Sequence, residues 1–362
     1  MPPSEQDIQS ALKEVVDPNT GKDLVGTRSA RNVKVSGADV AVDVELAYPA
    51  KTQIEPIRKL VSQKLRSLPG VGAVTVNVSA RIASHAVQRG VKLVPGVKNI
   101  IAVASAKGGV GKSTTAANLA LALAAEGAAV GVLDADIYGP SQPTMLGIAG
   151  RPDSRDGKSL EPMVAHGVQA ISIGFLIDVD TPMVWRGPMV TQALEQLLKD
   201  TRWRDVDYLV VDLPPGTGDI QLTLAQKVPV TGAIIVTTPQ DIALIDARKG
   251  FKMFEKVGIP ILGVVENMAT HVCSSCGHEE HIFGSGGAER MCKDYDCEFL
   301  GALPLDIRIR EHADSGKPTV VADPDGRVAE IYRRIARRAA VKIGDLQKDM
   351  TSKFPTIVVQ KT

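Results

Sequence analysis

A glycine-rich stretch at residues 101–114, IAVASAKGGVGKST, has the residue types and spacing needed to bind a phosphate. An apolar, β-branched run precedes it and an Ala/Leu-rich segment with high helix propensity follows it, which predicts strand, loop and helix. Glycines let backbone N–H groups approach an anion closely, and the helix dipole adds attraction. The residues expected to bind a nucleotide here are Lys107, Gly108, Gly109, Val110, Gly111, Lys112, Ser113 and Thr114.

Two side chains in this loop have more specific expected roles. Lys112 is expected to reach the β- and γ-phosphates, and the Ser113 hydroxyl is expected to bind Mg²⁺. The usual pattern is G-x-x-x-x-G-K-S/T, but here Ala106 replaces the first glycine and a second lysine, Lys107, follows it. The loop therefore carries one lysine more than the usual pattern requires.

Two acids at strand ends are expected to complete the nucleotide site. Asp212 ends the apolar run 208–212, which has the form of a Walker B strand whose carboxylate holds Mg²⁺ directly or through water. Asp136 follows the strand predicted at 129–133, and acids at the carboxyl end of a parallel strand face the ligand crevice. We expect Asp136 to orient the attacking water or a Mg²⁺-bound water, with a solvated loop acid as the alternative. The stiff loop at 213–219, LPPGTGD, is expected to sense the γ-phosphate.

Asn267 ends another apolar strand and is expected to contact the purine base, because its amide both donates and accepts hydrogen bonds. Capping of the loop by Asn267 is the alternative. The sequence has no Asn-Lys-x-Asp guanine signature, so ATP is favoured over GTP.

The cysteines are confined to one short region, which favours a metal site over a disulfide framework. The four are Cys273, Cys276, Cys292 and Cys297. The first two form a C-x-x-C turn, which brings two thiolates to one metal. One interpretation is Zn²⁺ held by four cysteines, or by two cysteines with His278 and His281. A second is a [4Fe-4S] cluster, which usually takes four thiolates, shared between two chains of a symmetric dimer. A redox dithiol is the third.

The elements that position these residues follow an alternating pattern from Asn99 onward. Strand–helix alternation and continuous apolar strands predict an α/β fold with a mostly parallel sheet and helices on both faces. Strands are predicted at 100–104, 129–133, 168–173, 208–212, 232–237, 261–267 and 299–303. Helices are predicted at 113–126, 188–200, 221–227, 244–257 and 324–343, the last with a solvated basic face that contains Arg337.

Residues 1–80 are predicted to form a separate small α+β domain. Its expected order is helix (7–16), strand (32–36), strand (40–46), helix (54–68) and strand (71–78), and Ser4 with Asp7 is a candidate capping box. It has no charged cluster, cysteine or histidine pair that indicates chemistry, so we expect an interaction or regulatory module. A basic linker is expected at 81–98, the nucleotide-binding domain at 99–345 and a polar tail at 346–362.

Composition narrows the class of protein. The 362 residues are 44% hydrophobic and 4% aromatic with a net charge of +1, which indicates neither a nucleic-acid partner nor a base-stacking surface. No apolar run reaches the roughly 18 to 20 residues of a membrane helix, and the polar start is unlike a secretory signal. We expect a cytoplasmic protein with neither nucleic acid nor membrane as partner.

The combination of motifs resembles a known family. SAKGGVGKST (105–114) resembles the deviant Walker A motif of the MinD/ParA-type P-loop NTPases, in which Lys107 matches the additional lysine. Four further segments are DADIYGPS (134–141), WRGPM (185–189), VDLPPGTGD (211–219) and VENM followed by CSSCG (265–277). With them, residues 100–345 resemble the Mrp/ApbC branch, the iron–sulfur cluster carrier ATPases.

The N-terminal region resembles the small iron–sulfur assembly domain that many Mrp/ApbC proteins carry. Some stand-alone members of that domain have a cysteine in the loop after the second strand. The corresponding loop here, residues 48–52, has none, so we expect no metal role for this domain.

The resemblance implies a homodimeric, slowly hydrolysing ATPase that carries a [4Fe-4S] cluster and delivers it to apoproteins, working with cluster-assembly proteins. The catalytic residues would be Lys107, Lys112, Asp136 and Asp212. In this family the additional lysine reaches across the dimer to the partner's nucleotide. Cys273 and Cys276 match the C-x-x-C that holds the cluster between two protomers.

The same resemblance leaves the remaining candidate ligands with smaller roles. Cys292 and Cys297 would be auxiliary or structural, and His278 and His281 would be loop residues. Two alternatives remain. One is a positional ATPase of the MinD/ParA type, which the basic helix at 324–343 keeps open, and the other is a zinc-stabilised ATPase without a cluster.

Overall fold

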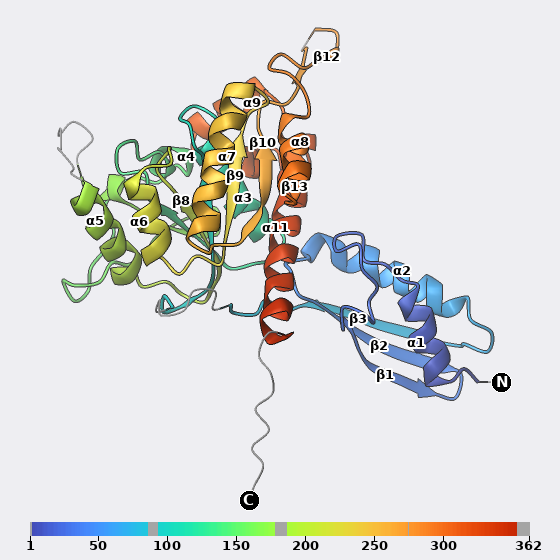
Figure 1. Ribbon diagram of the computed structural model, residues 1–362. Helices are drawn as coiled ribbons and strands as arrows, with labels where there is room; N and C mark the ends of the chain where they lie inside the picture. The colour runs from blue at the N-terminus through green and yellow to red at the C-terminus, as the bar shows by residue number, and fades with distance from the viewer. Residues whose placement is uncertain (1, 86–92, 178–186, 274, 353–362) are drawn as a thin grey trace, which may run out of the picture. The chain divides into compact units, whose positions relative to one another are not determined.

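A computed structural model describes residues 2–85, 93–177, 187–273 and 275–352 (Figure 1). The chain divides into two compact units, one of residues 1–83 with 340–362 and the other of residues 84–339. Parts of the predicted linker (86–92), the WRGPM segment (185–186), the C-x-x-C turn (Ser274) and the tail (353–362) lie outside the described residues.

The first unit is a small α+β structure whose elements match the predicted order. They are α1 (Glu5–Lys13), β1 (Ala30–Ser36), β2 (Asp39–Leu46), the 3₁₀ turn η1 (Lys51–Gln53), α2 (Ile54–Arg66) and β3 (Val74–Ala80). The central strand β2 pairs antiparallel with β1 and parallel with β3. Its alternate residues from Val40 to Leu46 are buried, as the period-2 pattern predicts. The capping box between Ser4 and Asp7 is confirmed at the start of α1.

The second unit is built on an eight-stranded sheet. Its strands are β4 (Val97–Ala104), β5 (Val130–Asp134), β6 (Met163–Ala165), β7 (Val168–Ser172), β8 (Val206–Asp212), β9 (Gly232–Thr237), β10 (Ile261–Glu266) and β13 (Phe299–Ala302). The order is β13-β10-β9-β4-β8-β5-β7-β6, and every pair is parallel except β6–β7. The predicted mostly parallel α/β fold is confirmed. The strand before the glycine-rich loop, β4, lies centrally between β8 and β9.

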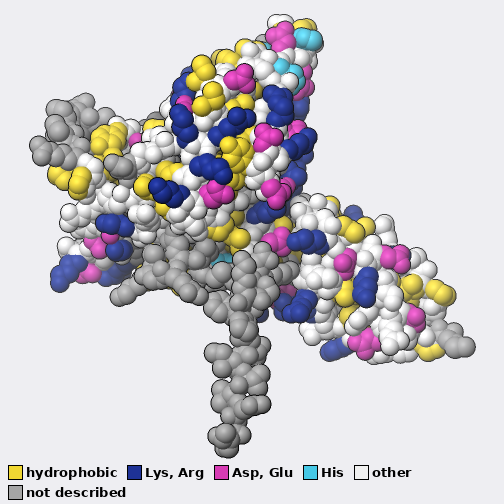
Figure 2. Space-filling view, in the orientation of Figure 1, with side chains coloured by type: hydrophobic (Ala, Val, Ile, Leu, Met, Phe, Trp, Pro, Cys, Tyr) yellow, Lys and Arg dark blue, Asp and Glu magenta, His cyan; other side chains and the backbone are white. Residues whose placement is uncertain are grey.

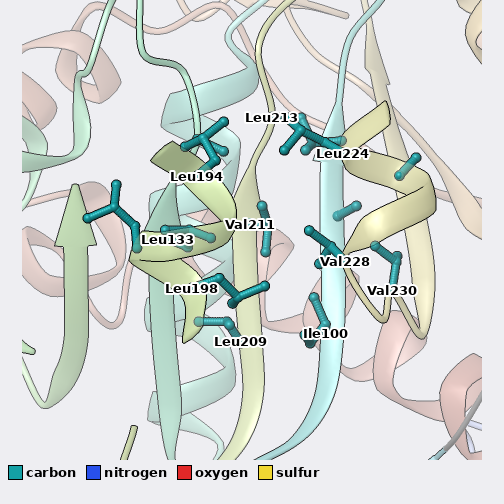
Figure 3. Packing of buried hydrophobic residues seen from close by; sticks show 14 of the residues in the cluster. Ile100, Leu133, Leu194, Leu198, Leu209, Val211, Leu213, Leu224, Val228 and Val230 are labelled. Carbon is teal, nitrogen blue, oxygen red and sulfur yellow. The ribbon is translucent and has the colours of Figure 1, made fainter. Parts of the chain in front are cut away.

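Helices cover both faces of this sheet (Figure 1). They are α3 (Lys112–Ala125), α4 (Gln142–Met145), α5 (Gly187–Asp200), α6 (Asp219–Lys227), α7 (Asp241–Lys256), α8 (Gly287–Asp294), α9 (Ile307–Asp314), α10 (Thr319–Ala322) and α11 (Arg327–Ser352), with a 3₁₀ turn η2 (Ile173–Phe175). Figure 3 shows leucines of α5 and α6 packed on one face of β4, β5 and β8, with α3 behind the sheet. This packing buries one face of β4 and thereby holds the strand that leads into the glycine-rich loop.

The last helix differs from its prediction in two ways. It runs to Ser352 rather than ending at Ile343. Glycine favours the end of a helix, but Gly344 lies within this one. It packs against Ala47 in the first unit, and a Cβ on Gly344 would lie 3.5 Å from Ala47 Cβ. The basic face is also not wholly solvated, because Arg337 is buried and paired with the buried Glu126 of the segment that follows α3.

Several short elements were not predicted. They are β6, α4, α8, α9, α10 and the hairpin strands β11 (His271–Val272) and β12 (Glu279–Glu280). The helix α8 illustrates the reason, because its first turn is stabilised by a distant residue: Glu266 Oε2 accepts a hydrogen bond of 2.7 Å from the Ala288 N–H. Such a cap is not visible in the local sequence. No helix in the described part of the chain is long and apolar enough to cross a membrane.

Candidate functional site

The loop between β4 and α3 is shaped by glycines in backbone conformations that other residues avoid. Gly109 and Gly111 have φ angles of 82° and 83°. Gly111 also has no room for a side chain, since a Cβ there would lie 2.1 Å from Asn267 Nδ2. Lys107, Gly108 and Gly109 are exposed, so the loop is open to a ligand.

Lys112 is the buried cation of the site. Its Nζ lies 2.5 Å from Asp212 Oδ1, 3.6 Å from Asp136 Oδ2 and 3.1 Å from Ser113 Oγ. The side chain of Lys112 is 6% exposed and that of Asp212 is fully buried. The structure thus brings together four residues that the sequence singled out from three separate segments. Their oxygens are hard ligands of the kind Mg²⁺ prefers, and two carboxylates suit an ion that keeps several waters and phosphate ligands.

Strand register explains why two carboxylates lie side by side here. Asp134 and Asp212 are direct neighbours at the ends of the paired strands β5 and β8. Burial and the negative charge of Asp212 raise the pKa of Asp134 to about 7. The Asp134 carboxylate accepts hydrogen bonds from the backbone N–H groups of Asp136, Ser141 and Gln142. Asp134 therefore anchors the loop that follows β5.

Asp136 lies on that loop and is also buried. Burial raises the pKa of Asp136 above its usual range, with Asp212 adding to the effect and Lys112 opposing it. The alternative of a solvated loop acid does not describe this side chain.

Gln142 is a residue of this site that the sequence did not single out. Its Nε2 donates to Asp212 Oδ2 at 2.9 Å and to the Ser113 carbonyl oxygen at 3.1 Å. A glutamine in a loop gives no chemical signal by itself, and only the tertiary fold places Gln142 between the loop and β8.

Asn267 contacts the glycine-rich loop directly. Its Nδ2 donates a hydrogen bond of 2.9 Å to the Val110 carbonyl oxygen, so its observed contact braces the loop. This position at the loop leaves the expected contact with a base as a proposal.

The loop after β8 is joined to the start of the glycine-rich loop. The Leu213 N–H donates to the Val103 carbonyl oxygen at 3.1 Å, and the Gly216 N–H donates to the Ser105 carbonyl oxygen at 2.9 Å. A displacement of either loop would therefore move the other.

Lys107 differs from Lys112 in its exposure and in its contacts. It is exposed, and its ammonium group makes no hydrogen bond or ion pair with the residues that the structure describes. Its charge is available to a ligand or to another chain.

Cys273 and Cys276 lie in the turn between β11 and β12. The turn is closed by the Cys273 N–H, which donates to the His278 carbonyl oxygen at 2.9 Å, and the Gly277 N–H, which donates to the Cys273 carbonyl oxygen at 2.8 Å. Backbone N–H groups at residues 275 and 276 lower the pKa of Cys273, which favours the thiolate that binds metal. Figure 2 shows histidine and acidic side chains on the surface around β12.

The other two cysteines belong to a different environment. Cys292 is buried in an apolar cluster with residues of α7 and α8. A hydrogen bond with Cys297, together with burial, raises the pKa of Cys292. Across the described residues, no group of three or more His, Cys, Asp or Glu side chains is arranged to hold a metal ion. A zinc site with four ligands from one chain is therefore not assembled in this part of the protein.

Comparison with known proteins now decides the family. The ParA family model, described as NUBPL iron-transfer P-loop NTPase, matches residues 96–340. This chain belongs to that family. A second model, described as iron–sulfur cluster assembly protein, matches residues 5–78. The expected resemblance to MinD/ParA-type P-loop NTPases with an N-terminal assembly domain is confirmed.

Individual relatives of this NUBPL-type P-loop NTPase are closely similar. An iron–sulfur cluster carrier protein of Pseudomonas fragi is 61% identical over 279 residues, 76% of this chain and 97% of its own. The protein of the same name from Escherichia coli K12 is 54% identical over 312 residues, 85% of each chain. A solved nucleotide-binding protein from Archaeoglobus fulgidus, in complex with ADP, is 37% identical with a TM-score of 0.57, covering 64% of this chain and 90% of that one.

The left-handed conformation of Gly111 leads to a prediction about stability. Gly111→Ala should lower the free energy of unfolding by about 1 to 3 kcal/mol, since φ is positive and the methyl group meets Asn267. Gly108→Ala is the matched control, with open space at its Cβ, and should change it by less than about 0.5 kcal/mol. Denaturant unfolding without nucleotide measures both, and equal losses would contradict this description of the loop.

The raised pKa of Asp134 leads to a prediction about pH. Between pH 3.8 and about 7 the folded protein keeps a proton on Asp134 that the unfolded chain releases. The stability from this proton is complete below that window and is lost as the pH rises through it. Asp134→Asn should flatten this fall in a pH series of unfolding free energies. The exposed Asp294→Asn should leave it unchanged, and an unaltered slope in Asp134→Asn would refute the assignment.

Proposed function

We propose that this protein is an ATP-binding, slowly hydrolysing carrier that holds a [4Fe-4S] cluster across a homodimer and transfers it to apoproteins. Relatives that are 61% and 54% identical bear the name iron–sulfur cluster carrier protein, and the family model is one of iron transfer. The observation that carries the proposal for this chain is the pair of thiolates in the β11–β12 turn.

Two thiolates make half of a cluster site. Cys273 and Cys276 are accessible, and the described residues bring no third metal ligand to them. A [4Fe-4S] cluster usually takes four thiolates, and a two-fold axis supplies the other two from a second copy. The zinc alternative requires two more ligands from the same chain. Cys292, one of the candidate ligands, is buried elsewhere in an apolar cluster. The cluster is the cargo of the protein, so an open two-thiolate turn suits release as well as binding.

The nucleotide site in this proposal uses the residues around Lys112. Lys112 and the loop N–H groups hold the phosphates of ATP, and Ser113 with Asp212 holds Mg²⁺. The buried Asp136 orients water, and Asn267 lies at the loop where it could reach the base. Bound Mg²⁺ would neutralise phosphate charge.

Lys107 acts on the partner's nucleotide in this proposal. Its ammonium group is exposed, and it finds no partner among the described residues of its own chain. A positioned cation stabilises the charge that develops in phosphoryl transfer. The same two-fold axis that completes the cluster site would bring each Lys107 to the opposite nucleotide.

Nucleotide state is proposed to control the cluster through the loop after β8. The hydrogen bond between Gly216 and Ser105 joins that loop to the phosphate site. A change at the γ-phosphate would shift this loop, the dimer geometry and the distance between the two C-x-x-C turns. The N-terminal region, proposed to span residues 1–80, would serve as a module for client and assembly proteins.

The last helix gives less support to the alternative, a positional ATPase of the MinD/ParA type. Two of its basic residues serve internal contacts: Arg337 pairs with Glu126, and Arg338 donates to the carbonyl oxygens of Phe299 and Leu300. Cations engaged in this way are less available to DNA or to a lipid surface.

Anaerobic reconstitution with iron and sulfide tests the proposal. The wild-type protein should show a broad absorbance near ~400 nm and about four irons per dimer, from the four-thiolate argument. Cys273→Ala should lose both, because one ligand per chain disappears. Cys297→Ser is the matched control and should keep both. Bound zinc without colour, or an intact cluster in Cys273→Ala, would overturn the proposal.

A further inference from the structure

Gln142 connects three segments that meet at the nucleotide site. Its side-chain Nε2 donates to Asp212 Oδ2 at the end of β8 and to the Ser113 carbonyl oxygen in α3. Its backbone N–H donates to Asp134 Oδ2 at 3.0 Å. The residue is 1% exposed, so these contacts are shielded from water and hold it in one orientation.

The other atom of the same amide has no partner. Gln142 Oε1 is buried and accepts no hydrogen bond from the described residues, and the same holds for Ser141 Oγ beside it. A buried acceptor left unsatisfied costs about 1 to 3 kcal/mol. The described residues therefore leave Oε1 without a hydrogen-bond donor.

A hydrated divalent cation would supply that donor. Mg²⁺ retains several waters when it binds with a nucleotide, and these waters donate hydrogen bonds to neighbouring oxygens. The orphaned Oε1 belongs to the same amide group whose Nε2 contacts Asp212 and the Ser113 carbonyl oxygen, two residues already suited to the ion.

We propose that Gln142 is a positioning residue for the metal–nucleotide complex, an inference that rests on the proposed ATP binding. Its Nε2 fixes the orientation of the Asp212 carboxylate, and its Oε1 accepts a hydrogen bond from a water of Mg²⁺. A glutamine suits this place better than an acid, because two buried carboxylates already face the single cation Lys112. It supplies donors and an acceptor without another negative charge near the phosphates.

Calorimetric titration with ATP, once with Mg²⁺ and once with EDTA, tests this role apart from activity. Wild-type protein should bind ATP more tightly with Mg²⁺. In the near-isosteric Gln142→Met, the ratio of ATP affinity with Mg²⁺ to ATP affinity in EDTA should fall by about 10- to 100-fold. This is the usual effect of removing a residue that orients metal ligands. The variant's binding in EDTA should stay within about two-fold of the wild type.

Two further variants make the result decisive. Gln169→Met loses two hydrogen bonds to the Arg204 backbone, on a strand at the far side of β5, and should behave as wild type. Gln142→Glu keeps an acceptor oxygen but replaces the donor that holds Asp212 with a second carboxylate oxygen, so it should lose the Mg²⁺-dependent gain as Gln142→Met does. It decides the matter if Gln142→Met does not fold.

The inference fails if Gln142→Met keeps the full Mg²⁺-dependent gain, or if its affinity falls equally with and without the metal. It also fails if Gln142→Glu keeps the full gain. A wild-type protein that binds no ATP under either condition would instead refute the proposed function, so the two failures are distinguishable.

Discussion

The buried ion pair between Lys112 and Asp212 is the interaction on which the nucleotide site depends. A buried charge that loses its partner destabilises a protein strongly, so each residue holds the other in place. The pair joins the start of α3 to the end of β8, and with Asp136 it gathers the loop after β5 around the same cation. A phosphate would compete for Lys112 and release Asp212 toward a metal. Binding of ATP would therefore rearrange contacts that hold three segments together.

Two other features look incomplete within one chain, and a single two-fold axis would complete both. Lys107 is an exposed cation without a partner among the described residues, and Cys273 with Cys276 offers half the thiolates of a [4Fe-4S] cluster. In the proposed carrier, dimerisation brings a lysine to each nucleotide and four thiolates to one cluster. The link between Gly216 and Ser105 then gives nucleotide state a physical route to the dimer geometry.

The sequence predicted what depends on local pattern, and the structure was needed where distant residues meet. The parallel sheet, the loop and the acids at strand ends follow from periodicity and from the rule that parallel strands end at one edge. Gln142 was missed because its role exists only beside Asp212. The burial of Arg337 was missed because its partner Glu126 lies far away in the chain. The helix α8 was missed because Glu266, outside it, caps its first turn.

The central claim is that two copies of the chain complete each other's sites, and a heterodimer with differently tagged protomers tests it most directly. One protomer carries Lys107→Ala and the other Lys112→Ala, and ATP hydrolysis is compared with both homodimers. If Lys107 acts across the dimer, each homodimer is inactive, and the heterodimer keeps one working site and about half of the wild-type rate. A heterodimer as inactive as the two homodimers, or a fully active Lys107→Ala homodimer, would contradict the account.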